Sequence, residues 1–328
     1  MSTQSSHSPL SLRILLGFAA IYVIWGTTYL AIAFAIQTIP PFISGAMRFL
    51  VAGAAMYAWL RVRGDKRGDK KSDKVFAGVH LPTAALVGVL LSGIGNGFVI
   101  WAQQGIPSGV AALIVCSMPV LVLVLDWILF TRRAPSPQGL IGVAIALAGV
   151  VTIVAHTHEL SGAAQPLYLI SMLAATVGWS FGTLLQKRSA NPQTVLSFTC
   201  AQMLIGGVFQ AIMATVDGEW ARFDPASISL ASLLAVAYLI VFGSIIALNV
   251  YLWLLTRVAA QKVTTYALVN PVVAMLLGSI FLNEKITTLA VIAAMLVLAG
   301  VALVLFQDLN PLRLLRDRRA RAARISSP

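Results

Sequence analysis

Residues 81–130 read LPTAALVGVLLSGIGNGFVIWAQQGIPSGVAALIVCSMPVLVLVLDWILF, and this stretch decides the fold. It holds two apolar runs, 81–103 and 107–130, and its only charged side chain is Asp126. A helix needs about 20 predominantly apolar residues to cross the ~30 Å of hydrocarbon in a bilayer. Each run is therefore long enough to span a membrane once. Gly105 and Pro107 lie between the runs and predict a short turn.

The same pattern continues in both directions along the chain of 328 residues. Hydrophobic residues make up 59% of the chain and charged residues only 10%, whereas a soluble domain carries roughly 25% charged residues. These proportions exclude a soluble domain, a disordered chain, a coiled coil and a nucleic-acid-binding module. We predict an all-α polytopic membrane protein with ten transmembrane helices. The ten apolar runs are 12–36, 41–60, 81–103, 107–130, 136–155, 166–187, 193–216, 229–256, 260–282 and 286–306.

The first run, 12–36, is longer than the apolar core of a signal peptide, and no A-x-A site ends it. We therefore expect a permanent first helix. The net charge of +12 is explained by where the basic residues lie. With the N-terminus in the cytoplasm, 20 of the 23 Lys and Arg residues fall in cytoplasmic segments. Only Arg222 and Lys285 fall outside, and Arg48 lies within a span.

The positive-inside rule predicts such an asymmetry of charge. We therefore expect both termini in the cytoplasm and the protein in the inner (plasma) membrane. The Lys-rich loop 61–74 and the basic tail 307–328 are interpreted as topogenic segments, with a lipid-binding patch as the alternative.

The two halves of the chain resemble each other weakly. Each half has five spans, an odd number, so the two copies would cross the membrane in opposite senses. Inverted repeats are typical of secondary transporters, whose substrate site lies near the midplane at the repeat interface. The predicted units are a first repeat (1–155), a second repeat (156–306) and a basic tail (307–328). Offsets of 151 to 154 residues align Trp25 with Trp179, Leu50 with Leu204, Gly53 with Gly207, Ser92 with Ser244, Trp101 with Trp253, Pro119 with Pro271 and Leu147–Val150 with Leu298–Val301.

Pro119 and Pro271 occupy matching positions near mid-depth of the fourth and ninth spans. A proline inside a helix removes one intrahelical hydrogen bond and frees a carbonyl. We interpret the pair as hinges in helices that line a cavity; two ordinary kinks are the alternative.

Arg48 is the only basic residue well inside a span, ~10 Å below the outer end of the second helix. Such a residue marks a functional site by default, and one cation would suit a carboxylate or another anionic group. The alternative is a structural arginine bonded to backbone carbonyls. The repeat counterpart of Arg48 is the neutral Gln202.

Two carboxylates, Asp126 and Glu284, are interpreted as residues without a role in transport. Asp126, near the cytoplasmic end of the fourth span, is expected to pair with Arg132 or Arg133, with proton coupling as the alternative. Glu284, beside Lys285, is interpreted as a solvated residue of an outer loop.

The remaining candidates are aromatic and amide side chains within spans, which together would suit amphipathic or aromatic solutes. For any one of these aromatics, packing or anchoring at the membrane interface is the alternative. The complete predicted substrate-binding set is Trp25, Tyr29, Arg48, Asn96, Trp101, Trp179, Asn249, Tyr266 and Asn270.

Sequence motifs for soluble chemistry are missing. The chain has no GxxxxGK[ST] for ATP, no HExxH and no Cys/His cluster, so we expect no enzyme, no cofactor and no metal centre. His156 and His158 are interpreted as loop histidines, and Cys116 and Cys200 as buried thiols.

The order of these features resembles the EamA-type branch of the drug/metabolite transporter superfamily, over roughly residues 12–306. The resemblance implies ten helices in two inverted five-helix repeats around a central cavity, as in bacterial inner-membrane exporters of drugs or metabolites. One departure is that Thr131–Arg133 ends the fourth helix, so the acidic residue seen at Glu284 occurs in one repeat only. The residues that carry the resemblance are Trp25–Tyr29 (WGTTY), Pro40–Pro41, Met47–Leu50 (MRFL), Asn96–Gly97, Pro107–Gly109 (PSG), Phe242–Ala247 (FGSIIA) and Tyr266–Val273 (YALVNPVV).

We therefore expect a secondary transporter that exports small amphipathic metabolites or drugs by alternating access. The alternatives are an uptake carrier or facilitator for amino acids or related metabolites and, less favoured, a membrane scaffold without transport. The expected partners are a small-molecule substrate and the lipid bilayer, with no nucleic acid. Small-residue faces could also support a homodimer, with packing inside one chain as the alternative. These faces comprise Gly139, Gly142, Ala146 and Gly149 on the fifth span and Ala293, Ala294 and Gly300 on the tenth.

Overall fold

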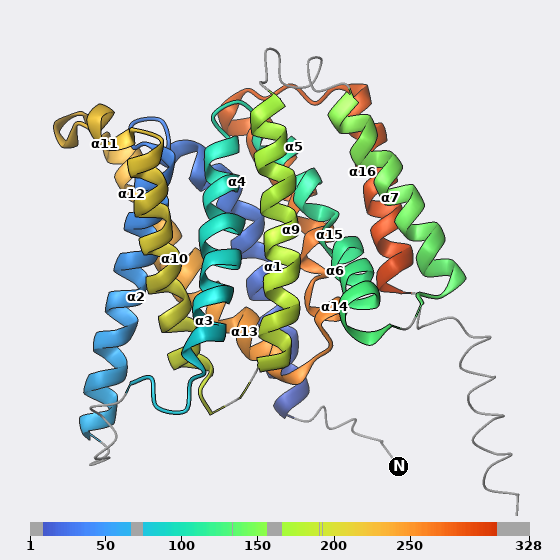
Figure 1. Cartoon of the computed structure of the whole chain (residues 1–328). Helices are drawn as coiled ribbons and strands as arrows, with labels where there is room; N and C mark the ends of the chain where they lie inside the picture. Colours follow the sequence, from blue (N-terminus) through green and yellow to red (C-terminus); the bar gives the residue numbers. More distant parts are fainter. Residues whose placement is uncertain are drawn as a thin grey trace, which may run out of the picture.

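The computed structural model describes residues 9–66, 75–132, 134–155, 166–189, 191 and 193–306, and all regular structure in these ranges is helical (Figure 1). Several predictions fall elsewhere. The tail 307–328, residues 67–74 of the Lys-rich loop, and His156, His158 and Arg133 lie outside the described residues.

Five helical passes form the first half of the chain: α1 (Pro9–Ala35), α2 (Pro41–Lys66), a third pass of α3 (Leu81–Val87), η1 (Gly88–Asn96) and α4 (Gly97–Ala102), a fourth of α5 (Ser108–Cys116), α6 (Met118–Leu125) and η2 (Asp126–Thr131), and α7 (Pro137–Ala155). Five more form the second half: α9 (Pro166–Ser189), α10 (Val195–Val216), a pass of α12 (Leu230–Tyr238), η4 (Leu239–Ile246) and α13 (Ala247–Arg257), a pass of α14 (Ala260–Val263) and α15 (Tyr266–Leu282), and α16 (Thr288–Leu305). The short α11 (Glu219–Arg222) and η3 (Pro225–Ser227) follow α10.

Eight of these passes are long and apolar enough to span a membrane, and α7 and α15 supply two shorter apolar helices. The prediction of ten spans in two repeats is confirmed. Because each half has five passes, α1 and α9 run in opposite directions through the molecule, as an inverted repeat requires.

The alternation of direction gives the molecule two different ends (Figure 1). We call the end where α2, η2, α9 and α13 finish the basic end; Arg63, Arg132 and Arg188 lie there. We call the other end, where α2 and α5 begin, the carboxylate end; it holds Glu219 and Glu284. That the basic end faces the cytoplasm stays a prediction.

Corresponding helices of the two halves pack against each other. α2 packs along its counterpart α10, and α7 packs along its counterpart α16. The first helix of each half packs along the fourth pass of the other half: α1 lies against α15, and α9 lies against α5 and α6. The closest approach of α2 and α10 is reciprocal, because a Cβ at Gly53 would lie 2.8 Å from the side chain of Leu204 and a Cβ at Gly207 would lie 2.8 Å from that of Leu50. The aligned Leu and Gly pairs of the sequence repeat are thus a symmetric packing contact.

The small-residue faces of α7 and α16 meet inside this chain. A Cβ at Gly142 would lie 2.7 Å from the carbonyl oxygen of Gly300, and one at Gly149 would lie 2.7 Å from Val297. Packing within one chain therefore occupies these faces, and a homodimer stays a prediction that needs another surface.

Three passes of the bundle carry irregularities near mid-depth, and the ninth pass carries one near the basic end. The π-helical segments η1 and η4 occupy matching places in the third and eighth passes, and such segments often occur at functional sites. The fourth pass breaks at Ser117, two residues before Pro119. The ninth breaks between α14 and α15, and Pro271 lies inside the continuous α15. The two prolines therefore differ in local structure, and the hinge role stays a prediction.

Candidate functional site

Arg48 lies in the middle of the helix bundle and is only 3% exposed. Its Nε donates a hydrogen bond to the Oγ of Ser244 on η4 at 2.7 Å, and its guanidinium lies 4.7 Å from the ring centre of Phe49. Gly243 allows this approach, because a Cβ there would lie 3.1 Å from Nη2 of Arg48. No carboxylate of the described residues forms an ion pair with Arg48. A guanidinium has five donors, so most of its donor capacity stays open to a ligand.

The second repeat contains a neutral copy of this contact. Nε2 of Gln202 donates to the Oγ of Ser92 on η1 at 3.3 Å, and both residues are fully buried. Gln202 aligns with Arg48 and Ser92 with Ser244, so each repeat sends a long polar side chain to a serine of the other. The two contacts differ in charge, and only the first repeat places a cation at the cavity.

Aromatic rings surround the other side of the site. Trp25 lies at their centre, with ring-centre distances of 4.5 Å to Tyr266, 5.1 Å to Tyr251 and 5.7 Å to Trp179. Its indole Nε1 donates to the carbonyl of Gly243 at 3.4 Å, which ties the ring to η4 beside Arg48. Such edge-to-face rings present both faces and edges to a bound apolar group.

These residues enclose one cavity of about 40 Å³ between the two repeats. That volume holds a few water molecules, whereas ligand pockets usually measure roughly 300 Å³ or more. In this conformation the cavity is therefore too small to hold a metabolite. The buried Oδ1 of Asn270 has no hydrogen-bond partner and supplies one open acceptor. The cavity is lined by Trp25, Thr28, Tyr29, Ile32, Arg48, Asn96, Val99, Val115, Trp179, Tyr266 and Asn270.

A model of the EamA-like transporter family matches residues 12–155 and again residues 166–306 of this chain. The chain belongs to the EamA-like transporter family. Among its relatives, the "Uncharacterized inner membrane transporter YedA" of Escherichia coli (strain K12) is 36% identical over 286 residues, which cover 87% of this chain and 88% of the relative. The family is one of transporters, not of enzymes.

A more distant relative in the same organism carries a functional description. The "Probable amino-acid metabolite efflux pump" of E. coli (strain K12) is 24% identical over 293 residues, covering 87% of this chain and 92% of the relative. A solved crystal structure that is 22% identical matches 89% of this chain and 97% of its own with a TM-score of 0.62. This likeness shows that the two share a fold.

Two of the nine predicted site residues do not line the cavity of this EamA-like protein. Trp101 packs near the carboxylate end, with ring-centre distances of 4.7 Å to Tyr168 and 6.5 Å to Phe42. Asn249 lines a separate apolar crevice of 420 Å³ that opens on the surface of the bundle beside Met56 and Trp59. The other seven predicted residues meet at the cavity.

Asp126 does not pair with Arg132 as expected. Its Oδ1 lies 3.5 Å from Nη2 of Arg188, at the end of α9, and this guanidinium also lies 3.8 Å from the ring centre of Phe130. The ion pair joins the two repeats at the basic end. The other expected partner, Arg133, lies outside the described residues. Sequence reasoning missed Arg188 because it is distant in the chain and adjacent only in the fold.

Glu284 is half-buried and hydrogen-bonded, and is not the freely solvated residue of the sequence interpretation. Its carboxylate accepts hydrogen bonds from the backbone N–H and the hydroxyl of Ser108 at 2.7 and 2.9 Å, and from the N–H of Gly109 at 3.3 Å. It thereby caps the start of α5, where four backbone N–H groups lack intrahelical partners. Lys285 beside it is exposed.

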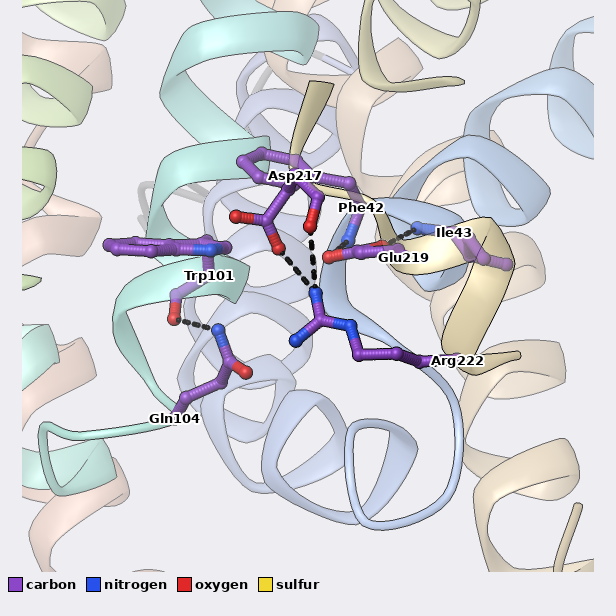
Figure 2. A network of polar contacts seen from close by, with 7 residues as sticks. All are labelled: Phe42, Ile43, Trp101, Gln104, Asp217, Glu219 and Arg222. Carbon is purple, nitrogen blue, oxygen red and sulfur yellow. Dashed lines mark hydrogen bonds and ion pairs between the residues drawn. The ribbon is translucent and has the colours of Figure 1, made fainter. Parts of the chain in front are cut away.

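Glu219 makes a similar contact that sequence reasoning did not foresee (Figure 2). Its carboxylate accepts from the backbone N–H groups of Phe42 and Ile43 at 3.1 and 2.9 Å, at the start of α2. Nη2 of Arg222 donates to the carboxylate of Asp217 at 2.7 Å. Figure 2 shows this contact beside Glu219. Both carboxylates belong to the second repeat and cap helices of the first.

Proposed function

We propose that this protein is an inner-membrane secondary transporter that exports small amphipathic metabolites or drugs by alternating access. The observation that carries the proposal is Arg48, a buried cation that forms no ion pair with a carboxylate of the described residues, in a cavity between two inverted repeats that also presents Trp25, Tyr29, Trp179 and Tyr266. An anionic or zwitterionic solute with an apolar body would satisfy both the guanidinium and the rings. The relative described as an inner membrane transporter supports the compartment, and the one described as an efflux pump supports export.

In this proposal, the substrate contacts are the seven predicted residues that line the cavity. Trp101 and Asn249 are left out because they lie elsewhere. The cavity would enlarge as the two repeats rock, with Pro119 and Pro271 as the hinges. A secondary transporter can run in either direction, depending on the gradients across the membrane. The direction of net flux under a physiological gradient therefore distinguishes export from the alternative, uptake.

The test is transport by the purified protein in proteoliposomes, with a panel of anionic, zwitterionic, cationic and neutral solutes and with or without an imposed pH gradient. We expect saturable transport of anionic or zwitterionic amphipathic solutes. Arg48→Ala should abolish it, whereas Arg63→Gln, which removes an exposed cation outside the cavity, should not. Transport of no solute in the panel, or equal rates for wild type and Arg48→Ala, would refute the proposal.

A further inference from the structure

The fourth and ninth passes meet at the carboxylate end through Glu284. The backbone N–H of Glu284 donates to the carbonyl of Gly278 at 3.1 Å, which fixes the residue to the end of α15. Its side chain then holds the start of α5 by three hydrogen bonds from Ser108 and Gly109. We call this set the Glu284 contact. Hydrogen bonds to an ionised carboxylate are about twice as strong as neutral ones, and a helix N-terminus favours a negative charge.

Two glycines make room for the Glu284 contact. A Cβ at Gly278 would run into Oε2 of Glu284 and would lie 2.7 Å from the hydroxyl of Ser108. A Cβ at Gly109 would lie 2.7 Å from the side chain of Met275. α5 and α15 therefore approach closely just above the cavity, which both passes line through Val115 and Asn270.

The basic end repeats the backbone geometry but lacks the carboxylate. The fourth pass ends at Arg132 with φ 55°, as the ninth ends at Asn283 with φ 55°. The ninth pass starts after Ala259 (φ −61°, ψ 142°), as α5 starts after Pro107 (φ −55°, ψ 148°). The residue before α14 is Ala259, whose side chain has no hydrogen-bonding atom and provides no cap.

The contacts between the two passes follow the same asymmetry. α5 packs along α15, whereas α6 meets the short α14 only at its edge. Asp126, the carboxylate on the basic side, is turned to Arg188 instead. The fourth and ninth passes are thus held together by a carboxylate at the carboxylate end, and the described residues of the basic end form no equivalent contact between them.

We propose that the Glu284 contact holds α5 against α15 and so closes the path from the cavity to the carboxylate end. We call this closure the gate. Because the basic end has no matching carboxylate among the described residues, the transporter without substrate rests closed toward the carboxylate end. This rests on the proposed alternating access and deepens it, because a resting state closed on the predicted outer side admits substrate from the cytoplasm. Glu284 is here a positioning residue for the gate and touches no substrate.

Cysteine accessibility tests the proposal without knowledge of the substrate. In a background that carries Cys116→Ala and Cys200→Ala, a single cysteine replaces Val115, which lies in the last turn of α5 and lines the cavity. Intact cells are treated with a membrane-impermeant maleimide from outside. We expect the background protein to stay protected and Glu284→Ala to be labelled about tenfold faster or more, the population shift that loss of charge-assisted hydrogen bonds predicts.

Two further variants make the result specific. Gly278→Ala keeps Glu284 but places a Cβ against its carboxylate, so it should raise labelling as Glu284→Ala does. Lys285→Ala changes an exposed neighbour outside the contact and should leave labelling at the background level. The thermal midpoint of each purified variant shows that it is folded.

Protection of folded Glu284→Ala and Gly278→Ala at the background level would overturn the proposal, and so would labelling of the background protein from outside. Faster labelling of both variants, in a protein that transports no solute in proteoliposomes, would support the gate and refute the proposed function. Transport by the wild-type protein, together with background labelling of both variants, would support the proposed function and refute the gate.

Discussion

At the scale of single residues, the two repeats carry a neutral and a charged side chain at equivalent positions, Gln202 and Arg48. Gln202 shows that a neutral side chain at this position makes the contact to a serine of the opposite repeat. Arg48 makes the same contact with Ser244 and adds a positive charge at the cavity that no carboxylate of the described residues pairs with. A buried charge is costly without a partner, so its retention at only one of two equivalent positions favours a role in binding.

Arg48→Gln is therefore expected to fold and to lose selectivity. The new amide would bond Ser244 as Gln202 bonds Ser92, so the thermal midpoint should stay close to that of the wild type. The KM for an anionic or zwitterionic substrate should rise roughly tenfold or more, because a charge-assisted hydrogen bond is lost. The KM for a neutral analogue should change little. Initial rates in proteoliposomes measure both, and equal increases for the two substrates would contradict the assignment.

Glu219 should make stability depend on pH. Burial raises the pKa of its carboxyl above the ordinary 4.5, and Asp217 adds to the rise, although hydrogen bonds from Phe42 and Ile43 and the charge of Arg222 lower it. Because the folded protein then binds the proton more tightly than the unfolded chain, stability is highest at low pH and falls as pH rises through the raised pKa.

Glu219→Gln is expected to remove this dependence. As pH rises above 4.5, the thermal midpoint of the wild type should decline more steeply than that of the variant. Asp224→Asn, which changes an exposed carboxylate of the same connection, serves as the control and should follow the wild type. Parallel curves for wild type and Glu219→Gln would show that the carboxyl of Glu219 does not titrate in this way.

At the scale of helices, apolar length and proline placement suffice to predict the spans, but one residue of register decides which side chains meet. Asn96 and Asn249 align within one residue of each other in the repeat, and a one-residue step turns a side chain by about 100° around a helix. Asn96 accordingly lines the cavity and Asn249 the outer crevice. Trp101 lies in the last turn of its pass, too near the carboxylate end to reach mid-depth.

Contacts between distant segments are a second limit on prediction. Glu284 bonds Ser108 across 176 residues of sequence, and the neighbouring Lys285 made it look like half of a solvated pair. The π-helical segments η1 and η4 also left no mark in the apolar pattern, because a π segment needs no special composition. Such features follow from packing between the repeats and appear only once the fold is known.

The packing of α7 on α16 gives a prediction at this scale. A Cβ at Gly300 would run into the backbone of Ala146, so Gly300→Val should destabilise the protein by about 1–3 kcal/mol through overpacking. Thermal unfolding in detergent measures the loss. Met295→Val, at a 58% exposed position of the same helix, should change little. A Gly300→Val protein of unchanged stability that shifts from dimer to monomer would instead place this face between two chains.

At the scale of the whole molecule, the small volume of the cavity implies that the repeats must move. A volume of about 40 Å³ admits no metabolite, and the pairing of corresponding helices favours rotation of paired units over unfolding of any one pass. The sequence predicts the inverted repeat that permits such motion, because matched Trp, Gly and Pro positions are visible in the chain. The closed state is not visible there, since it depends on contacts that form only at the interface of the repeats.

This motion is expected to bend the fourth and ninth passes at their prolines. Pro119→Ala and Pro271→Ala each restore an N–H group and allow an uninterrupted hydrogen-bond ladder, so the maximal rate of transport should fall while KM stays near the wild-type value. Pro137→Ala, at the first residue of α7 where a proline interrupts no internal bond, is the matched control and should transport normally. Initial rates over a range of substrate concentrations separate the two parameters.

A rise in KM with an unchanged maximal rate would mean that the prolines shape the cavity and do not act as hinges. A loss of rate in only one variant would fit the difference already seen in the structure, where the fourth pass breaks beside Pro119 and α15 continues through Pro271.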